Sequence, residues 1–137
     1  LNVGIVIFCL LWYILSIMFD VWYIHLEPTQ IIYRNYLGAK KVIKASDIYY
    51  FEREKRTTRV VTTCGEYQVW DKLDDIMKQL PELDFSRCHN SFIVHFRYVQ
   101  ELQRDGYLLY NKDFVQISRG YNSKTKEDFL KWSILYI

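Results

Sequence analysis

A group of hydrogen-bonding side chains lies between apolar residues in segment 85–95, which reads FSRCHNSFIVH. Its members are Arg87, His89, Asn90 and Ser91. Guanidinium, imidazole, amide and hydroxyl groups suit the phosphate oxygens and base edges of nucleic acids. The flanking apolar residues, Phe85 before the group and Phe92, Ile93 and Val94 after it, can anchor the segment in a core. The pattern therefore predicts a fixed segment that presents polar groups to a ligand.

Each residue of this segment also has a structural interpretation. Asn90 suits two hydrogen bonds to an adenine or a place in a turn, and we favour the adenine. His89 suits a phosphate or a packed structural role, and both stay open. In a regular strand Arg87 lies on the same side as His89, as a contact or as scaffold. Cys88 could be a redox switch, but a small buried hydrophobic residue is the preferred interpretation. We expect His95 to be structural.

The densest basic cluster comes earlier, in the charged stretch EREKRTTR at residues 52–59. Lys55, Arg56 and Arg59 suit phosphate contacts, although a run of charges is also typical of a solvated face. Arg119 follows the apolar stretch FVQIS and suits a guanine or a phosphate, with a weak surface ion pair as the structural alternative. We favour DNA contact for Arg119 and leave the three earlier residues open.

The bulk composition fits one folded domain with an appended element. The chain has 137 residues, of which 50% are hydrophobic and 18% are aromatic. All 18 Lys and Arg follow Pro28, whereas Asp20 and Glu27 precede it, which leaves 18 basic against 14 acidic residues, a net +4, beyond Pro28. This modest basic bias permits an anionic partner. The three cysteines lack paired spacing and a CxxC motif, so a disulfide framework or zinc ribbon is not expected.

The N-terminal part of the chain differs from the rest. No charged residue lies between Val3 and Phe19, and after Asp20 the apolar sequence continues to Ile24. About 20 apolar residues in a helix span a bilayer core, and Trp22 stands where an interfacial aromatic residue is expected. We therefore predict a transmembrane helix and juxtamembrane linker at residues 1–28. The basic residues that follow then place the C-terminal domain, residues 29–137, in the cytoplasm at the inner membrane.

This apolar run has two other conceivable roles. A signal peptide fits poorly, because no basic residue precedes the run and no small-residue cleavage site follows it. A helix buried in a larger partner or in a dimer is the structural alternative to the membrane span.

The sequence beyond Pro28 predicts a mainly β domain. Short stretches rich in β-branched and aromatic residues, among them QIIYRNY, VVTT, YQVW and FVQIS, are separated by turn residues. One helix is predicted after Asp71, a good N-cap, and ends at Pro81. The apolar residues at helical spacing within it are Leu73, Ile76, Met77 and Leu80. Residues 122–134 are a candidate second helix.

Several features, in this order, resemble the LytTR family, a bacterial DNA-binding domain of transcription regulators. They are the strand SDIYYFE, a hairpin containing Gly65 with a Leu-rich helix after it, the segment FSRCHNSFIVH, and a strand that ends in ISR at residues 117–119. The resemblance covers residues 30–132. It implies a stack of small, mostly antiparallel β-sheets with one or two short helices. It also implies that loops and strand ends, rather than a recognition helix, enter the major groove of DNA.

The resemblance implies DNA contacts in three places. These are the connector at residues 55–59, which includes Lys55, Arg56, Thr58 and Arg59, then His89 and Asn90, and finally Arg119. Thr58 is a departure, because a member of the family carries a His there, before its Arg. Thr still suits a base edge or a thymine methyl group, with a shorter reach and no charge.

The leading hypothesis is sequence-specific binding of double-stranded DNA by a membrane-tethered bacterial transcription regulator, with two copies as a homodimer on direct repeats. The alternative is a membrane-anchored sensory or protein-interaction module that has lost DNA binding. An enzyme is not expected, because the sequence has no HExxH motif, P-loop or nucleophile elbow. A hydrolase would have to rely on Cys88, His89 and His95. We expect no cofactor and no bound metal.

Overall fold

The computed structural model describes residues 3–26, 30–34, 38 and 40–136 of the chain. Its α-helices are α1 (Val3–Leu26), α2 (Leu73–Met77) and α3 (Asn122–Tyr136). Its strands are β1 (Gln30–Arg34), β2 (Lys40–Lys44), β3 (Ile48–Glu54), β4 (Thr57–Thr62), β5 (Gly65–Val69), β6 (Phe85–His89), β7 (Phe92–His95), β8 (Val99–Leu102), β9 (Gly106–Leu109) and β10 (Phe114–Gln116). Three short 3-10 turns are η1 (Ala45–Asp47), η2 (Phe96–Tyr98) and η3 (Arg119–Tyr121).

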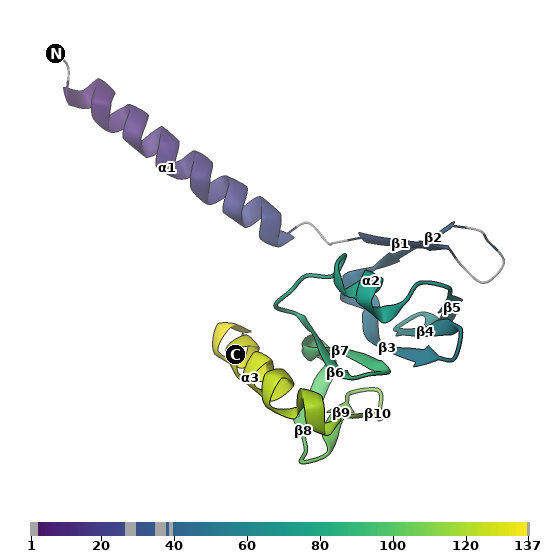
Figure 1. The fold of residues 1–137 in the computed structure, drawn as a ribbon. Coiled ribbons are helices and arrows are strands. Elements are labelled where there is room, and N and C mark those ends of the chain that lie inside the picture. The colour runs from purple at the N-terminus through teal and green to yellow at the C-terminus, as the bar shows by residue number, and fades with distance from the viewer. Residues whose placement is uncertain (1–2, 27–29, 35–37, 39, 137) are drawn as a thin grey trace.

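The N-terminal apolar run is helical, as predicted, and forms α1, which projects away from the sheets (Figure 1). The predicted membrane span is not supported: among the helices that the structure describes, none is both long and apolar enough to cross a membrane. The predicted span began at Val3 and ended near Phe19, with Trp22 and Ile24 following. The side chains of these last three residues, and the linker at residues 27–28, lie outside the described part of the chain.

The strands of the described residues pair into three antiparallel sheets (Figure 1). β1 and β2 form a two-stranded ribbon. The central sheet has five strands in the order β5-β4-β3-β7-β6, and the third sheet has the order β10-β9-β8. Every pair of neighbouring strands in these sheets except β3 and β7 is also consecutive in the sequence. The predicted mainly β fold of small antiparallel sheets is confirmed.

The central sheet separates two hydrophobic cores, because side chains on a strand alternate between its faces. Two cross-strand rows at neighbouring positions show this. One row, on the face covered by α2 and β2, consists of Phe51, Val60 and Ile93. The other row, on the face covered by the third sheet and α3, consists of Tyr50, Val61 and Val94. The central strands are therefore apolar on both faces and are held rigidly between two layers.

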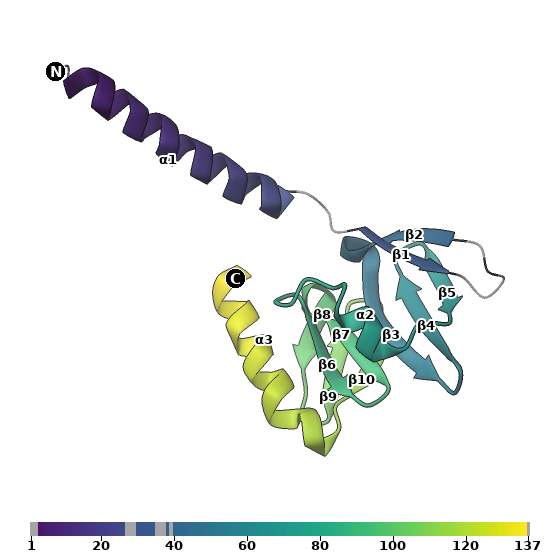
Figure 2. The same cartoon turned by 45° about the horizontal axis from the view of Figure 1, so that its top comes forward.

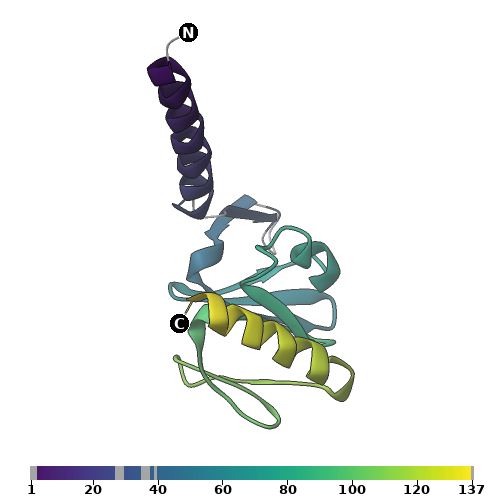
Figure 3. The same cartoon turned by 90° about the vertical axis from the view of Figure 1, so that its left-hand side faces the viewer.

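Helix α3 lies beside the strands of the second core (Figure 3). The ring of Phe129 is 5.4 Å from that of Phe96 and 5.7 Å from that of Tyr107. The hydroxyl of Thr125, which is buried, meets the Ser86 hydroxyl at 3.0 Å and the Tyr107 hydroxyl at 2.8 Å. This aromatic burial stabilises the contact, so the predicted tail helix is an integral part of the domain.

The predicted helix after Asp71 is present but shorter and later than expected. α2 begins at Leu73, and its N-cap is Lys72, without a side-chain capping bond. Asp71 does not cap the helix. Its carbonyl oxygen instead accepts hydrogen bonds from the Thr58 hydroxyl at 2.6 Å and from Arg53 at 3.1 Å. These bonds tie the start of the helix to the β3–β4 hairpin.

Candidate nucleic-acid interface

The turns of two hairpins lie at the same edge of the central sheet. β3 pairs antiparallel with β7, so the turn after β3, at residues 55–56, and the turn before β7, at residues 90–91, leave the sheet in the same direction. The Arg53 amide donates to the Ser91 carbonyl at 2.7 Å, directly beside both turns. Figure 2 shows the two hairpin tips at the lower side of the domain. The connector and the predicted Asn90 contact are therefore neighbours.

The third predicted contact reaches the same edge through the last strand. The Ser118 amide donates to the Cys88 carbonyl at 2.9 Å. This bond fixes the residue before Arg119 to the strand that leads into the turn at Asn90. Arg119 is exposed and opens the short turn η3. The structure thus brings together at one end of the domain three segments that are far apart in the sequence.

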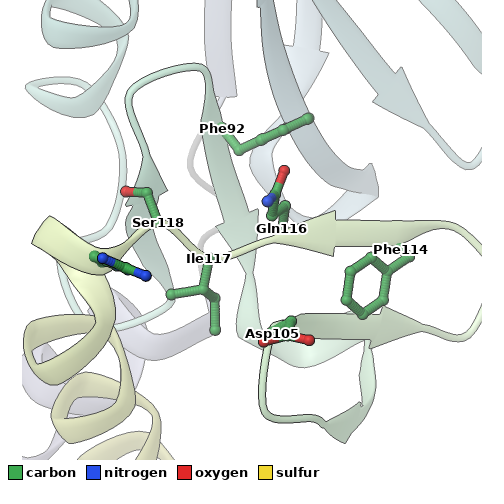
Figure 4. A pocket seen from close by; sticks show the side chains of 7 residues that line it. Phe92, Asp105, Phe114, Gln116, Ile117 and Ser118 are labelled. Carbon is green, nitrogen blue, oxygen red and sulfur yellow. The ribbon is translucent and has the colours of Figure 1, made fainter.

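The surface beside Arg119 is hollowed into a pocket of about 640 Å³. Figure 4 shows its wall, formed by Phe92 from β7, Phe114 and Gln116 from β10, and Asp105 from the turn before β9. Arg119 itself also lines the pocket. The lining therefore combines aromatic and polar side chains beside Arg119.

The side chains at the two tips and at Arg119 are open to solvent. Lys55, Arg56, Asn90 and Arg119 are all exposed. Within the described part of the chain, none of the three cations among them has a carboxylate within 4.0 Å that would neutralise it. Lys55 adopts a left-handed backbone with φ of 42°, which is uncommon for a residue other than glycine. The tight turn that this allows pushes both basic side chains outward.

Arg59 was a candidate phosphate contact, with a solvated face as the alternative, but in the structure its half-buried guanidinium is paired within the protein. Its guanidinium pairs with Glu52 across the β3–β4 ladder, with Glu54 at 3.3 Å and with Glu66 of β5 at 3.0 Å. It also donates to the Tyr50 hydroxyl at 3.3 Å. Burial alone would lower the pKa of Arg59, but the bond to Glu52 and the surrounding negative groups raise it above its usual value. The guanidinium charge is offset locally, which leaves Arg59 a structural role in the hairpin.

Thr58 was predicted to touch a base, and the structure corrects this. The residue is 0% exposed. Its hydroxyl donates to the Asp71 carbonyl at 2.6 Å and accepts from Arg53 at 3.2 Å. A buried hydroxyl with both of its bonding roles filled is a scaffold group. Thr58 lies on the inward side of β4, so it cannot reach DNA in this conformation.

The guanidinium of Arg87 also bonds groups within the protein. Its Nε donates to the His89 carbonyl at 3.0 Å and its Nη2 to the Asn90 carbonyl at 2.6 Å. Its Nη1 pairs with Asp74 at 2.6 Å. Of the two interpretations of Arg87, scaffold is the one that fits this geometry, because every nitrogen of the guanidinium is engaged.

His89 is half-buried, and one of its ring nitrogens is bonded within the turn. Its Nδ1 accepts a hydrogen bond from the Ser91 amide at 3.0 Å. In a neutral imidazole the proton then lies on Nε2, which can donate to a phosphate. The edge of the ring meets Phe92 at 5.3 Å between centroids. His89 can therefore both support the turn and donate outward, so the two interpretations are compatible.

Cys88 and His95 belong to the interior. Burial raises the pKa of the Cys88 thiol to about 12, and the residue is 0% exposed. His95 stacks on Phe85 at 4.2 Å, its Nδ1 lies 2.8 Å from the Ile48 carbonyl oxygen, and burial lowers its pKa. The structural role predicted for His95 is confirmed. Among the described residues, no group of three His, Cys, Asp or Glu side chains is placed to hold a metal ion.

Two supporting residues were missed in the sequence. Arg53 joins Thr58 to the Asp71 carbonyl, and Asp74 neutralises Arg87. Arg53 left no signal because its partners are mostly backbone carbonyls. Asp74 could be assigned only to the first turn of a helix, where an acidic residue is common.

Comparisons with known proteins agree with this architecture. A family model described as the LytTr DNA-binding domain matches residues 39–129. The transcriptional regulatory protein NatR of Bacillus subtilis is 44% identical over 59 residues, which cover 43% of this chain and 25% of NatR. The sensory transduction protein LytT of the same organism is 35% identical over 91 residues, covering 63% of this chain and 38% of LytT. The chain spans a quarter to two fifths of the length of these relatives.

A solved structure shares the fold. A LytTr DNA-binding domain from Bacillus cereus superposes with a TM-score of 0.66 at 21% sequence identity, and the match covers 74% of this chain and 97% of that one. At this identity the likeness concerns the fold. The transcriptional regulatory protein YpdB of Escherichia coli K12 adds a further relative, 34% identical over 92 residues, with 63% of this chain and 36% of YpdB covered.

Proposed function

This chain belongs to the LytTR DNA-binding domain family, and from that premise we propose that it binds duplex DNA sequence-specifically through loops in the major groove and regulates transcription. One observation supports the proposal most strongly. The exposed polar groups of two hairpin turns and of Arg119 gather at one edge of the domain, although other arginines nearby are neutralised within the protein. Such a surface can approach the negatively charged backbone and the base edges together.

The exposed residues divide into two roles. Asn90 is neutral, lies at a turn tip and carries an amide that can form two hydrogen bonds with an adenine. Arg119 can bond guanine through two hydrogen bonds, or a phosphate. Lys55 and Arg56 carry point charges on flexible stems, which suits phosphate contacts that hold the protein on DNA without selecting a sequence. His89 adds one donor beside the Asn90 turn.

The contact at Arg119 can be tested on its own. Arg119→Ala is expected to weaken binding to a preferred duplex by about 1–3 kcal/mol if the guanidinium contacts a guanine. Lys131→Ala removes the same charge from α3, where Lys131 pairs with Glu127 at 3.3 Å. Fluorescence anisotropy with labelled duplexes compares the two variants. Equal isotherms for Arg119→Ala and the wild type would remove Arg119 from the interface.

The proposed function is tested by selection from random duplexes with the purified full chain. We expect enrichment of a defined motif at low salt, and binding that falls steeply with added salt, by about 0.9 in the log–log slope for each neutralised phosphate. A motif repeated in the same orientation would support two copies of the chain on direct repeats, as the family resemblance implies. Failure to enrich any motif at low salt would contradict DNA binding.

A second candidate function is a sensory or protein-interaction module without DNA binding. The observation that favours it is that Thr58 is buried and Arg59 is paired with carboxylates, which leaves the connector with fewer groups for DNA than the sequence indicated. The same selection separates the two functions, because such a module would enrich nothing while keeping its fold.

The cellular location stays a prediction from the sequence. We propose that the protein acts at the inner membrane with its C-terminal domain in the cytoplasm, on the strength of the charge-free N-terminal run and the basic residues beyond it. Fractionation of cells that express the full chain tests this. Recovery of the protein only in the soluble fraction would contradict it.

A further inference from the structure

We propose that Asp74 is a positioning residue for sequence recognition: its carboxylate fixes Arg87, and Arg87 fixes the backbone of the turn that presents Asn90. This inference rests on the proposed function, since it concerns how the DNA-facing turn is held. Asp74 is acidic, lies on the short helix α2 outside all three predicted contact segments, and would be expected to repel DNA on charge alone.

The contacts of Arg87 carry the first step. Its Nε bonds the His89 carbonyl at 3.0 Å and its Nη2 bonds the Asn90 carbonyl at 2.6 Å. These two carbonyls belong to the peptide bonds on either side of Asn90. The guanidinium is planar and rigid, so its plane sets the orientation of both carbonyls. The remaining nitrogen, Nη1, is held by Asp74 at 2.6 Å, which fixes the plane itself.

The position of Asp74 carries the second step. α2 starts just after Asp71, whose carbonyl is bonded by Thr58 and Arg53 of the β3–β4 hairpin. Asp74, in the first turn of α2, is bonded to Arg87 of the β6–β7 hairpin. Residues 71–74 therefore join the two hairpins whose tips face DNA. A site that recognises bases needs its supporting shell fixed to a fraction of an ångström, and this segment provides that support between the tips.

Charge and exposure make the role testable. The Asp74 side chain is 85% exposed, whereas that of Arg87 is 20% exposed. An ion pair with so exposed a carboxylate contributes little to overall stability, so the fold should tolerate its loss. Repulsion alone predicts that removing Asp74 improves binding to every duplex. Positioning predicts that it impairs the distinction between duplexes. The two effects have opposite signs on the preferred sequence.

The neighbouring Asp75 gives a matched control. It lies in the same helical turn and carries the same charge, and it pairs with Lys78 at 4.0 Å rather than with a residue of the hairpins. Asp74→Ala and Asp75→Ala therefore make the same change in charge and a similar change in the helix. The full chain is used for both, with the duplex enriched by selection and a scrambled duplex of equal length.

The measured quantity is the ratio of the dissociation constants for the scrambled and the enriched duplex. We expect Asp75→Ala to tighten binding to both duplexes by the same factor and to leave the ratio unchanged. Asp74→Ala should tighten binding to the scrambled duplex by the same factor but lower the ratio of dissociation constants by about tenfold. A loss of this size is expected when one base contact is poorly aligned. Arg87→Lys should lower the ratio too, and adding Asp74→Ala to it should change little further, since the two residues act as a unit.

Two further measurements keep the interpretation clear. Thermal unfolding of the two alanine variants should coincide, and the backbone amide signals of Asn90 and Ser91 should shift in Asp74→Ala only. Equal ratios for Asp74→Ala and Asp75→Ala would overturn the proposal while leaving DNA binding intact. A wild type that prefers no duplex would contradict the proposed function itself and this inference with it.

Discussion

The β3–β4 and β6–β7 hairpins end side by side but use their polar residues differently. In both hairpins the protein itself binds a strand arginine: Arg59 is bound by three carboxylates, and Arg87 by two carbonyls and Asp74. Their tips differ. One presents Lys55 and Arg56, and the other presents the neutral Asn90.

This difference separates affinity from specificity. Charges at the first tip suit phosphates, which are present in DNA of any sequence. The amide at the second tip suits a base edge, which differs between sequences. The strand arginines of both hairpins hold the tips in place. Position along a hairpin, rather than residue type, therefore decides whether an arginine belongs to the scaffold or to the surface.

The β6–β7 tip should show the largest effect on specificity. Asn90→Ala removes the amide that can bond an adenine, so discrimination at one base pair should fall by about 1–3 kcal/mol. Binding to unrelated duplexes should hardly change, because Asn90 carries no charge. Competition binding with duplexes altered at each position of the enriched motif measures this. A uniform loss across all duplexes would move Asn90 from base contact to scaffold.

Within the β3–β4 hairpin, Arg59 should matter for stability rather than for DNA binding. Arg59→Ala leaves Glu52, Glu54 and Glu66 without their shared cation. The loss should lower the free energy of unfolding by about 1–2 kcal/mol, between the values for exposed and buried ion pairs. Chemical denaturation measures it. A variant of unchanged stability that has lost its salt-dependent binding would show that Arg59 contacts DNA after all.

The β3–β4 tip should act on every sequence alike. The double variant Lys55→Ala/Arg56→Ala should reduce the log–log salt slope by up to about 0.9 for each phosphate that is no longer neutralised, without changing the preferred motif. Lys126→Ala/Lys131→Ala removes two charges from α3 as the control. If only the preferred duplex were affected, the basic tip would have a role in base recognition that its point charges do not predict.

The smallest effect is expected beneath the β6–β7 tip. Burial raises the pKa of Cys88 to about 12, so its reactive thiolate forms only at strongly alkaline pH and the thiol stays protonated at about pH 8. Iodoacetamide at that pH should label the exposed Cys9 and Cys64 and spare Cys88 in the folded protein. DNA binding should not depend on reducing agent. Labelling of Cys88 in the native state would mean that the strand before Asn90 opens.

Much of the fold followed from local sequence patterns. β-rich stretches separated by turn residues, and a tail helix after residue 121, are set by periodicity and turn chemistry over a few residues at a time. The prediction that the connector, Asn90 and Arg119 serve one DNA-binding surface came instead from the family resemblance. The structural role of His95 was anticipated, and its stacking on Phe85 explains it.

The errors have two physical causes, strand register and hydrogen bonds to backbone carbonyls. Whether Arg59 or Thr58 faces solvent depends on strand register. A shift of one residue in the turn would move every side chain of the strand to the opposite face. The partners of Arg59 come from β3 and β5, and those of Thr58 and Arg53 are backbone carbonyls near α2. Because every residue has a backbone carbonyl, hydrogen bonds to such acceptors cannot be predicted from residue types. The N-cap was misplaced by one residue, since Lys72 occupies that position while the Asp71 carbonyl bonds the hairpin.

A map of the DNA interface by NMR is the decisive test of this surface. Backbone amide signals of the full chain are followed as its enriched duplex is added. We predict that the largest changes cluster at residues 55–57, 89–91 and 118–120, with smaller ones at Asp74 and little change along β5 and the outer face of α3. Changes concentrated on β5, on α3 or on the β1–β2 ribbon would contradict the claim that the two hairpin tips and Arg119 form the surface that meets DNA.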